Sequence, residues 1–424
     1  MAELLFELGT EELPARFVGP ALDDMVRVFE ERCRAMSIEF KSIRRFGTPR
    51  RLAIIADEVI EKTPDLVKEV QGPSVRAAFD EQGAPRVAAV KFAESVGTTI
   101  DRLKRVKTPK GEYLCATVDE KGRRTIDLMP EVLGACLRGI NFSKSMRWGD
   151  VEQAFGRPLH WIVALFGTEV IPVIFSDVRS DRRTRGHRFL APGEIELSCA
   201  ADYEARLTKA HVIADIETRK AMLVERISAC ARASGGTLIE DEALIDQVVN
   251  LVELPCPVLG TFEPRHLDLP QEVLVSEMKG HQRYFSLRDG AGRLLPKFIA
   301  VSNTPVRDEK LSIRGYERVL KARLTDGRFF FDEDRRTPLL DRVPMLHRIV
   351  WHRDVNSTWA EKVDRFRALA VWLAQRSGRA GDQSTIERAA TLAKADLVTG
   401  MVGEFPELQG VMGGLYAGAT EDPD

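Results

Sequence analysis

The pattern of apolar and polar positions changes twice along the chain. In roughly the first 175 residues, short apolar runs alternate with longer stretches in which apolar residues recur every three or four positions. Short apolar runs bounded by turn residues predict strands, and the longer spacing predicts amphipathic helices. We therefore expect helices over residues 21–36 and 88–96, and strands over residues 4–8, 52–56, 113–118, 160–166 and 170–175.

The middle of the chain combines two long helical patterns with a second pair of apolar runs. Helices are predicted over residues 202–234 and 241–254, and strands over residues 282–287 and 294–301. From about Lys310 onward the pattern predicts helix after helix and no strand. The change predicts an α+β fold, in which a mixed α/β region (1–325) is followed by an all-helical region (326–424).

Composition limits the class of protein. Of the 424 residues, 44% are hydrophobic and 30% are charged, so the chain can bury sizeable cores. The formal net charge of -2 excludes a global basic field, so a nucleic acid would have to meet local patches. The longest uncharged apolar stretch, 158–168, is too short to span a bilayer, and the N-terminus has no basic, cleavable signal. We expect no membrane association, and six widely spaced cysteines favour the reducing cytoplasm.

No motif for nucleotide, cofactor or metal chemistry is visible. The chain lacks a phosphate-binding glycine loop, a nucleophile elbow and a zinc-binding helix. His352-Arg353-Asp354 matches part of a kinase catalytic loop, but Trp359 stands where its asparagine would be needed. The seven histidines form no chelating pair with a supporting carboxylate. The sequence therefore predicts no catalytic residue, cofactor or metal in this chain.

One segment carries a dense positive charge. Residues 179–188, here called the arginine segment, hold five arginines and one aspartate, a formal charge of +4. Guanidinium groups bind phosphate bidentately, and Gly186 would allow the backbone to approach one. The alternative is a solvated loop with internal ion pairs. The candidate phosphate-binding residues in this segment are Arg182, Arg183, Arg185, His187 and Arg188.

Two further basic groups are weaker candidates. Lys279 and Arg283 lie beside His281 and Tyr284, between a helix and a strand. Basic residues interleaved with an aromatic fit contacts to an RNA backbone and an unstacked base, although Tyr284 is more often a core residue. A third group, Arg44, Arg45, Arg50 and Arg51, could equally be a solvated strand edge.

Nine motifs, each weak alone, occur in one order between residues 4 and 417. They are Leu8-Gly9-Thr10-Glu11-Glu12-Leu13-Pro14, Thr48-Pro49-Arg50-Arg51-Leu52-Ala53, Lys110-Gly111-Glu112-Tyr113, Met146-Arg147-Trp148-Gly149, Arg157-Pro158-Leu159-His160-Trp161, Gly186-His187-Arg188-Phe189, Met278-Lys279-Gly280-His281-Gln282-Arg283-Tyr284-Phe285, Lys394-Ala395-Asp396-Leu397-Val398-Thr399 and Gly403-Glu404-Phe405-Pro406-Glu407-Leu408-Gln409-Gly410. The series strongly resembles the β subunit of the bacterial tetrameric glycyl-tRNA synthetase.

The resemblance implies a division of labour. The α subunit of an α2β2 tetramer would hold the class II catalytic core with ATP and Mg²⁺, and this chain would bind and position tRNA(Gly) in the cytoplasm. Residues 1–325 would be a B3/B4-like region and 326–424 an incomplete HD-like domain, without the linker and anticodon-binding domain. Two departures stand out: His281 replaces a commonly acidic residue, and Ala395 precedes Asp396 where HD phosphohydrolases carry a histidine. Ala395 has no metal-ligating atom.

Two alternatives stay open at this point. The chain could be a stand-alone hydrolase, either a B3/B4-type deacylase of mischarged tRNA or an HD phosphohydrolase. It could also be a purely architectural subunit that supports the α dimer and contacts no RNA. The main hypothesis is that it contributes to glycine–tRNA ligase without being catalytic by itself.

Overall fold

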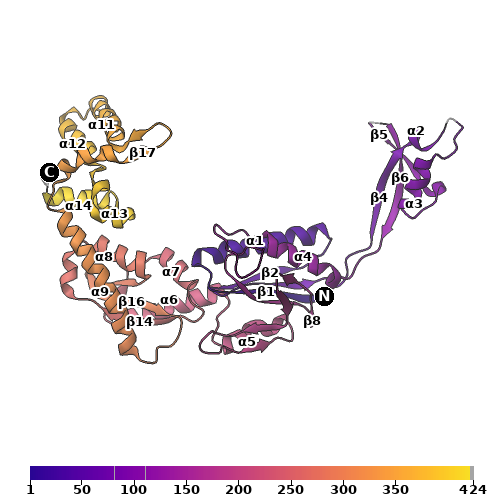
Figure 1. Ribbon diagram of the computed structural model, residues 1–424, viewed down its shortest axis with the longest axis horizontal. Coiled ribbons are helices and arrows are strands. Elements are labelled where there is room, and N and C mark those ends of the chain that lie inside the picture. The colour runs from indigo at the N-terminus through magenta and orange to yellow at the C-terminus, as the bar shows by residue number, and fades with distance from the viewer. Residues whose placement is uncertain (81, 110, 421–424) are drawn as a thin grey trace. The chain divides into compact units, whose positions relative to one another are not determined.

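The computed structural model describes residues 1–80, 82–109 and 111–420 (Figure 1). The chain divides into two compact units, Met1–Ile216 and Glu217–Asp424. The expected boundary between residues 325 and 326 falls inside one long helix, α9 (Glu309–Asp334). The mixed α/β character agrees with the predicted α+β class.

The first unit is built on a seven-stranded sheet with the order β2-β3-β1-β7-β10-β9, in which β8 also pairs with β7. All pairings are antiparallel except β10 with β7. The strands are β1 (Ala2–Thr10), β2 (Ser42–Thr48), β3 (Arg51–Val59), β7 (Leu159–Phe166), β8 (Glu169–Val170), β9 (Ile174–Phe175) and β10 (Val178–Asp181). The central strand β1 is buried on both faces.

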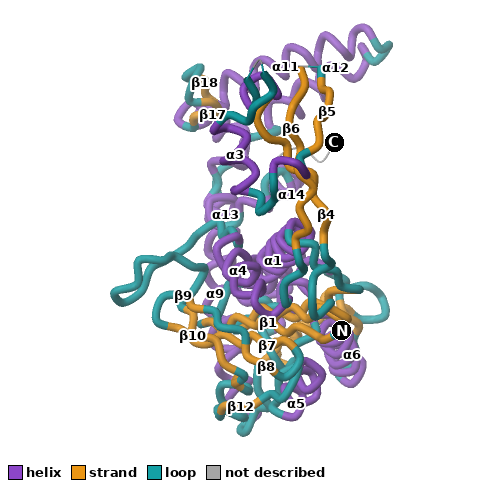
Figure 2. Tube along the Cα trace, turned by 90° about the vertical axis from the view of Figure 1, so that its right-hand side faces the viewer, coloured by secondary structure: helices purple, strands orange, loops and turns teal. Residues whose placement is uncertain are grey.

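Helices cover both faces of this sheet. On one side α1 (Ala15–Ala35) and α4 (Thr125–Gly139) pack on Leu4, Phe6 and Leu8. On the other side α5 (Tyr203–Lys209) shares a core with Leu5. Figures 1 and 2 show α1 and α4 on one side of the sheet and α5 on the other. Alternate residues of a strand point to opposite faces, so β1 supplies both cores at once.

A small three-stranded sheet is inserted between β3 and α4. Its order is β4-β6-β5, and its core contains Ala78, Ala89 and Leu114. Where the chain enters and leaves the insertion, Lys62 bridges Arg124, and the Thr63 amide donates to the Arg123 carbonyl at 2.9 Å. Its elements are β4 (Leu66–Ser74), α2 (Val75–Ala78), α3 (Val87–Ser95), η1 (Ile100–Arg102), β5 (Lys104–Thr108) and β6 (Gly111–Glu120).

The second unit begins with an antiparallel sheet of order β13-β15-β16-β14. Its core joins Phe298 of β16 to Leu320 and Leu324 of α9. The elements are α6 (Ile216–Ala233), which starts at the unit boundary, β13 (Thr237–Leu238), α7 (Glu242–Val249), β14 (Cys256–Thr261), η3 (Pro264–Asp268), α8 (Gln271–Glu277), the π-helix η4 (Met278–Gln282), β15 (Phe285–Arg288) and β16 (Leu294–Ser302).

The remainder of the second unit is mainly helical. A core of Leu339, Met401, Phe405, Met412 and Tyr416 joins its short helices. The elements after α9 are α10 (Leu339–Arg342), η5 (Val343–Arg348), β17 (Val350–His352), β18 (Ser357–Thr358), α11 (Trp359–Arg376), η6 (Ala380–Asp382), α12 (Gln383–Leu392), η7 (Ala395–Val398), α13 (Gly400–Glu404), η8 (Pro406–Leu408) and α14 (Val411–Thr420).

Three predicted elements are corrected by the structure. The helix expected over 202–234 is two helices, because His211 adopts a left-handed φ of 63° and the Val212 amide turns back to the Leu207 carbonyl. The strand expected over 170–175 is interrupted around Pro172, which cannot donate to a ladder. The hairpin of β17 and β18 contradicts the prediction that no strand follows Lys310.

Two further observations concern the environment of the chain. Among the described helices, none is both long and apolar enough to cross a membrane. All six cysteines are free thiols. Burial raises the pKa of the Cys33 thiol and of the Cys136 thiol to about 12, so both behave as inert core residues.

Candidate nucleic-acid interface

The arginine segment begins on the large sheet of the first unit. Its first part lies on β10, which pairs with β7, and its second part forms β11 (Arg183–Arg185), which pairs with β12 (Glu194–Glu196). Regular pairing holds the successive arginines in a fixed register. Sequence reasoning placed this segment correctly as basic, but it did not find the acidic residues that meet it.

Two of the candidate arginines are ion-paired. Arg183 Nε lies 2.7 Å from Asp181 Oδ2, and Arg183 Nη1 lies 3.2 Å from Glu194 Oε2. Arg188 contacts Glu11 and Glu12. Burial would raise the pKa of Glu11, but hydrogen bonds from Arg188 and His160 outweigh it and lower that pKa. The alternative of a solvated loop with internal ion pairs thus applies to Arg183 and Arg188, whose charges are partly neutralised.

Arg182 and Arg185 have different surroundings. Arg182 Nη2 donates to the Thr168 carbonyl at 3.1 Å, and the Arg185 guanidinium lies 5.3 Å from the centroid of the Trp161 ring. Within the described part of the chain, neither side chain has a carboxylate partner within 4.0 Å. Their charge is therefore the more available for a phosphate.

The structure corrects the role predicted for His187. Its side chain is fully buried, and its Nδ1 accepts hydrogen bonds from the Phe189 and Leu190 amides at 3.2 and 3.3 Å. His187 therefore holds the turn from inside and is not a surface contact. Gly186 is also buried, and a Cβ there would lie 2.4 Å from the Ala191 carbonyl oxygen, so this glycine serves internal packing.

The turn that His187 holds presents an aromatic side chain that sequence reasoning missed. Phe189 is 70% exposed and directly follows Arg188. An exposed aromatic ring beside arginines is the arrangement on which single-stranded bases stack. Its position in one of the quoted motifs was visible in the sequence, but its exposure was not, because phenylalanine is usually buried.

A buried charge network lies beneath the arginine segment. The Glu7 carboxylate accepts hydrogen bonds from Trp161 Nε1 and from Thr184 Oγ1, the latter at 2.6 Å. Arg51 Nη1 lies 3.8 Å from Glu7 Oε2, and both side chains are fully buried. Gly9 admits the Trp161 ring, since a Cβ there would lie 1.8 Å from it. The network connects β1, β3, β7 and β11, and it fixes the ring on which Arg185 rests.

The third basic group separates into two pairs with different environments. Arg44 contacts Asp57 and Glu204, and Arg45 contacts Asp23, so these two are the solvated strand edge that the sequence allowed. Arg50 and Arg51 are buried instead, and their guanidinium groups lie 5.8 and 5.6 Å from the Trp161 ring centroid. Arg50 and Arg51 therefore support the interior.

The second basic group lies in the second unit, around η4. Lys279 Nζ lies 2.6 Å from Asp241 Oδ2, and Arg283 Nη1 donates to the carbonyls of Lys279 and Gly280. Arg283 has a left-handed φ of 59°, which places it where η4 ends. Tyr284 is buried and stacked on Phe298 at 4.6 Å, so it is a core residue. Lys279 and Arg283 are thus held by local partners.

His281 is expected to influence stability in a pH-dependent way. Its Nδ1 lies 3.0 Å from Oε2 of the buried Glu277. Burial raises the pKa of Glu277, while His281 and Arg323 oppose the rise and Glu404 adds to it. When the pKa of a carboxyl is raised by folding, the folded protein loses stability as the pH rises from the ordinary pKa of about 4.5 through the raised pKa.

His281→Ala should therefore lower the unfolding free energy by about 1–2 kcal/mol at pH 8, and by less near pH 5, where Glu277 is protonated more often. Urea unfolding at the two pH values measures the difference. His352→Ala, on the exposed side of β17, is the control and should show no such pH dependence. An equal loss at both pH values would mean that His281 acts only by packing on Phe405.

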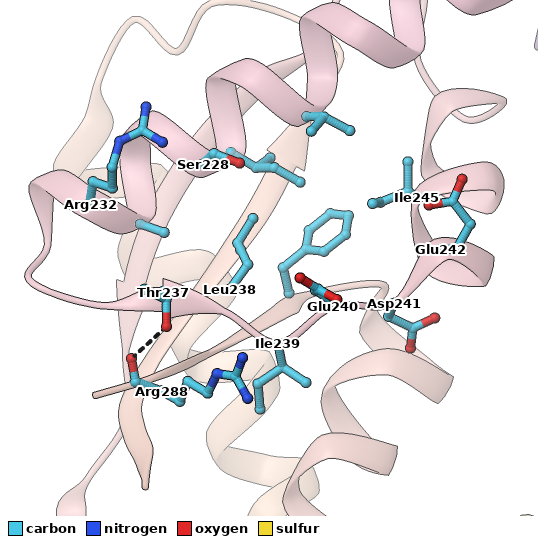
Figure 3. Close-up of a pocket in the computed structure, with 14 residues that line it drawn as sticks. Ser228, Arg232, Thr237, Leu238, Ile239, Glu240, Asp241, Glu242, Ile245 and Arg288 are labelled. Atoms are coloured by element: carbon cyan, nitrogen blue, oxygen red, sulfur yellow. Dashed lines mark hydrogen bonds between the residues drawn. The ribbon is translucent and has the colours of Figure 1, made fainter. Parts of the chain in front are cut away.

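A cavity of about 620 Å³ lies in the second unit between α6, β13, α7 and β15 (Figure 3). Its walls include Ile227, Leu238 and Phe285, and its rim includes Glu240, Asp241 and Arg288. Asp241 caps α7 through the Leu244 amide and pairs with Lys279, so its carboxylate is already bound. Among the described residues, no group of three or more His, Cys, Asp or Glu side chains could hold a metal ion.

Asp396, for which the sequence resemblance predicts the position of the HD aspartate, has a structural role in this chain. It is fully buried, and its Oδ2 accepts hydrogen bonds from the Gly410 and Gly413 amides at the start of α14. Gly413 allows this approach, since a Cβ there would lie 3.2 Å from the carboxylate. The carboxylate therefore caps a helix.

Comparisons with known proteins identify the family. The family model described as "Glycyl-tRNA synthetase beta subunit" matches residues 4–424. A protein named Glycine--tRNA ligase beta subunit from Myxococcus xanthus (strain DK1622) is 63% identical over 422 residues, which cover 100% of this chain and 60% of that protein. Proteins of the same name from Desulfatibacillum aliphaticivorans and Syntrophus aciditrophicus (strain SB) are 43% and 44% identical over 98% and 99% of this chain, and over 60% and 61% of their own lengths. This chain thus spans about 60% of the length of these relatives, and it belongs to the glycyl-tRNA synthetase beta subunit family.

Proposed function

We propose that this chain is part of a glycine–tRNA ligase, in which it binds and positions tRNA(Gly) for glycylation by another subunit. The match to the family model over residues 4–424 carries this proposal. Fixing the reacting end of a substrate is itself catalytic, since orientation can supply several kcal/mol (about 7–11 in ideal cases). The proposed partner is the α subunit in an α2β2 tetramer, which would bind ATP and Mg²⁺ in the cytoplasm.

Within this function, we infer that Arg182, Arg185 and Phe189 form the main RNA contact of the first unit. Arg182 and Arg185 have no carboxylate partner among the described residues, and Phe189 offers an exposed ring. Arg183 and Arg188 would contribute less, because they must first give up ion pairs. Lys279 and Arg283 remain secondary candidates, since the first is ion-paired and the second bonds its own backbone.

We also propose a B3/B4-like origin for the mixed α/β part and an HD-like origin for the helical part. The HD phosphohydrolase alternative is weakened by the capping role of Asp396 and by the methyl side chain of Ala395. A deacylase would release amino acid from mischarged tRNA, and a purely architectural subunit would give no crosslink to tRNA in the complete α–β complex. A deacylation assay and a tRNA crosslinking experiment therefore distinguish these two alternatives from RNA positioning.

Arg182→Ala combined with Arg185→Ala should raise the KM for tRNA(Gly) in the complete α–β complex. Each lost phosphate contact should cost about 1 kcal/mol, roughly fivefold in KM, and reduce the salt slope of binding by about one. Aminoacylation kinetics and filter binding across a salt series measure the two effects. Phe189→Ala should weaken binding by about 1–3 kcal/mol with little change in slope, because a stacked base carries no extra charge.

Arg27→Ala is the matched control, since Arg27 is an exposed arginine of α1 that pairs with Asp24 and Glu31. It should leave both KM and salt slope unchanged. Arg182→Lys with Arg185→Lys should restore most of the slope, since the charge is kept. If the alanine pair behaves like the control, the arginine segment does not bind tRNA.

A further inference from the structure

The inserted sheet presents a row of positively charged residues, which is less dense in the sequence than the arginine segment. Arg102 ends η1, and Lys104, Arg105 and Lys107 follow on β5. All four residues are exposed. They are called here the cationic edge strand, because β5 is one of the two outer strands in the order β4-β6-β5.

These four cations differ from the other basic groups in what surrounds them. Within residues 1–80, 82–109 and 111–420, no carboxylate lies within 4.0 Å of any of the four, whereas Arg44, Arg45, Arg183 and Arg188 all have such partners. Glu112 stands opposite Lys107 in the β5–β6 ladder without forming an ion pair. Among the described residues, ion pairs therefore do not neutralise the cationic edge strand, and the one acidic residue adjacent to it in the sequence, Asp101, forms none with it.

Asp80, which follows the Phe79 that Arg105 contacts, is an acidic residue of the insertion that is otherwise engaged. Asp80 Oδ1 accepts hydrogen bonds from the Gln82 and Ala84 amides at 3.0 and 2.7 Å, so it holds a turn. Arg105 is itself positioned, since its guanidinium lies 5.1 Å from the centroid of the Phe79 ring. A stacked guanidinium loses less side-chain freedom when it meets a ligand.

The spacing of the row suits a nucleic-acid backbone. At about 3.3 Å per residue, the part of the row on β5, from residue 104 to residue 107, extends over roughly 10 Å. A nucleic-acid strand in a duplex presents one phosphate per about 3.4 Å of helix axis. Because side chains alternate along a strand, Arg105 and Lys107 project to one face of the sheet and Lys104 to the other. A backbone lying along the edge could meet both faces.

Protection against aggregation is the ordinary reason for lysines on an edge strand. It accounts for Lys104 and Lys107, but Arg102 lies in η1 outside the ladder, and Arg105 rests on an aromatic ring. The edge strand β2 of the large sheet shows the contrast, because its Arg45 is ion-paired to Asp23. Edge protection thus leaves half of the row unexplained.

We propose that the cationic edge strand is a second RNA-binding surface, which contacts the phosphate backbone of tRNA without reading its sequence. This inference rests on the proposed function and adds a contact that the arginine segment does not supply. Backbone contacts of this kind fix the position of an RNA and make its affinity strongly dependent on salt.

The test replaces Arg102, Lys104 and Lys107 together with Gln in the complete α–β complex. Affinity for tRNA(Gly) should fall about tenfold at low salt, and the salt slope should fall by about two to three. The control replaces Lys41 and Arg45 with Gln. These two exposed cations lie at the β2 edge of the large sheet and already have carboxylate partners. The variant Lys104→Arg with Lys107→Arg should bind as the unchanged protein does.

The possible results separate the inference from its alternatives. Unchanged affinity and slope, with aggregation seen by light scattering, would overturn the inference in favour of edge protection. Unchanged tRNA affinity with weaker association of the α subunit would overturn it in favour of a protein contact. If the arginine-segment variants lose affinity and the Gln variant does not, only this inference fails. If the unchanged complex does not bind tRNA(Gly), the proposed function fails.

Discussion

Replacement of Glu7 by Gln should destabilise the first unit by about 3–5 kcal/mol, because it removes one partner of a buried ion pair. Glu7 and Arg51 are both fully buried, and their closest atoms lie 3.8 Å apart. Gln keeps the shape of the side chain but removes the negative charge that faces the Arg51 guanidinium. Trp161 and Thr184 both donate to Oε1 of Glu7, which the amide oxygen of Gln can replace, whereas the amide nitrogen of Gln would take the place of Oε2, which faces Arg51.

The same change should be visible in the titration of Tyr203. Burial, followed by the negative charge of Glu7, raises the pKa of the Tyr203 hydroxyl well above 10.0. Removing that charge should lower the pKa without returning it to 10.0, since burial remains. Urea unfolding and ultraviolet titration of tyrosine measure the two effects.

Glu58→Gln is the control for this experiment, since Glu58 is about half exposed and pairs with Lys41 at the surface. A surface pair of this kind is worth about 0–1 kcal/mol. A comparable loss in both variants would contradict the role given to Glu7. The double variant Glu7→Leu with Arg51→Leu should lose less than the two single changes added together, because it leaves no unpaired charge.

Asp334→Ala should have a similar effect in the second unit, a loss of about 3–5 kcal/mol. The Asp334 carboxylate is buried and accepts hydrogen bonds from the Gly400 and Met401 amides, each at 2.8 Å. It also accepts from the Tyr416 hydroxyl at 3.1 Å and lies 3.6 Å from Arg342 Nη2. One side chain of α9 thus joins α10, α13 and α14, and Ala would remove the acceptor that the Gly400 and Met401 amides share.

The measurement is urea unfolding together with amide hydrogen exchange of residues 400 and 401, whose protection should fall first. Asp332→Ala is the matched control, because Asp332 lies two residues earlier on the same helix and pairs with Arg328 at the surface. It should cost about 0.3–0.5 kcal/mol. If exchange at residues 400 and 401 stays as slow as in the control, Asp334 does not hold α13.

Apolar runs predicted the central strands because those strands are buried on both faces. The stretches over residues 4–8, 52–56 and 160–166 became β1, β3 and β7 with small extensions. Shorter elements were not predicted, because β17 and β18 have three and two residues and carry no periodic signal. The break near His211 depends on one left-handed residue, which apolar periodicity does not report.

The candidate site was predicted as a segment and not as a set of contacts. Density of arginine is a local property, so the sequence located residues 179–188. Neutralisation of an arginine charge by a carboxylate is not local in the sequence, because Arg188 pairs with Glu11, which lies 177 positions earlier. The burial of His187 and the exposure of Phe189 likewise depend on how one turn packs. For these reasons the tertiary structure was needed to rank arginines that look equivalent in the sequence.

The way the small sheet is attached has a consequence for protein engineering and for natural variation in length. Its two connecting segments pair with each other at Lys62 and Arg124, so the point of departure is already closed. A chain cut at such a point can be rejoined through a short turn, because its ends are adjacent before any linker is added. The inserted sheet is therefore a detachable module, and sequences that lengthen, shorten or lose it can retain the same parent scaffold.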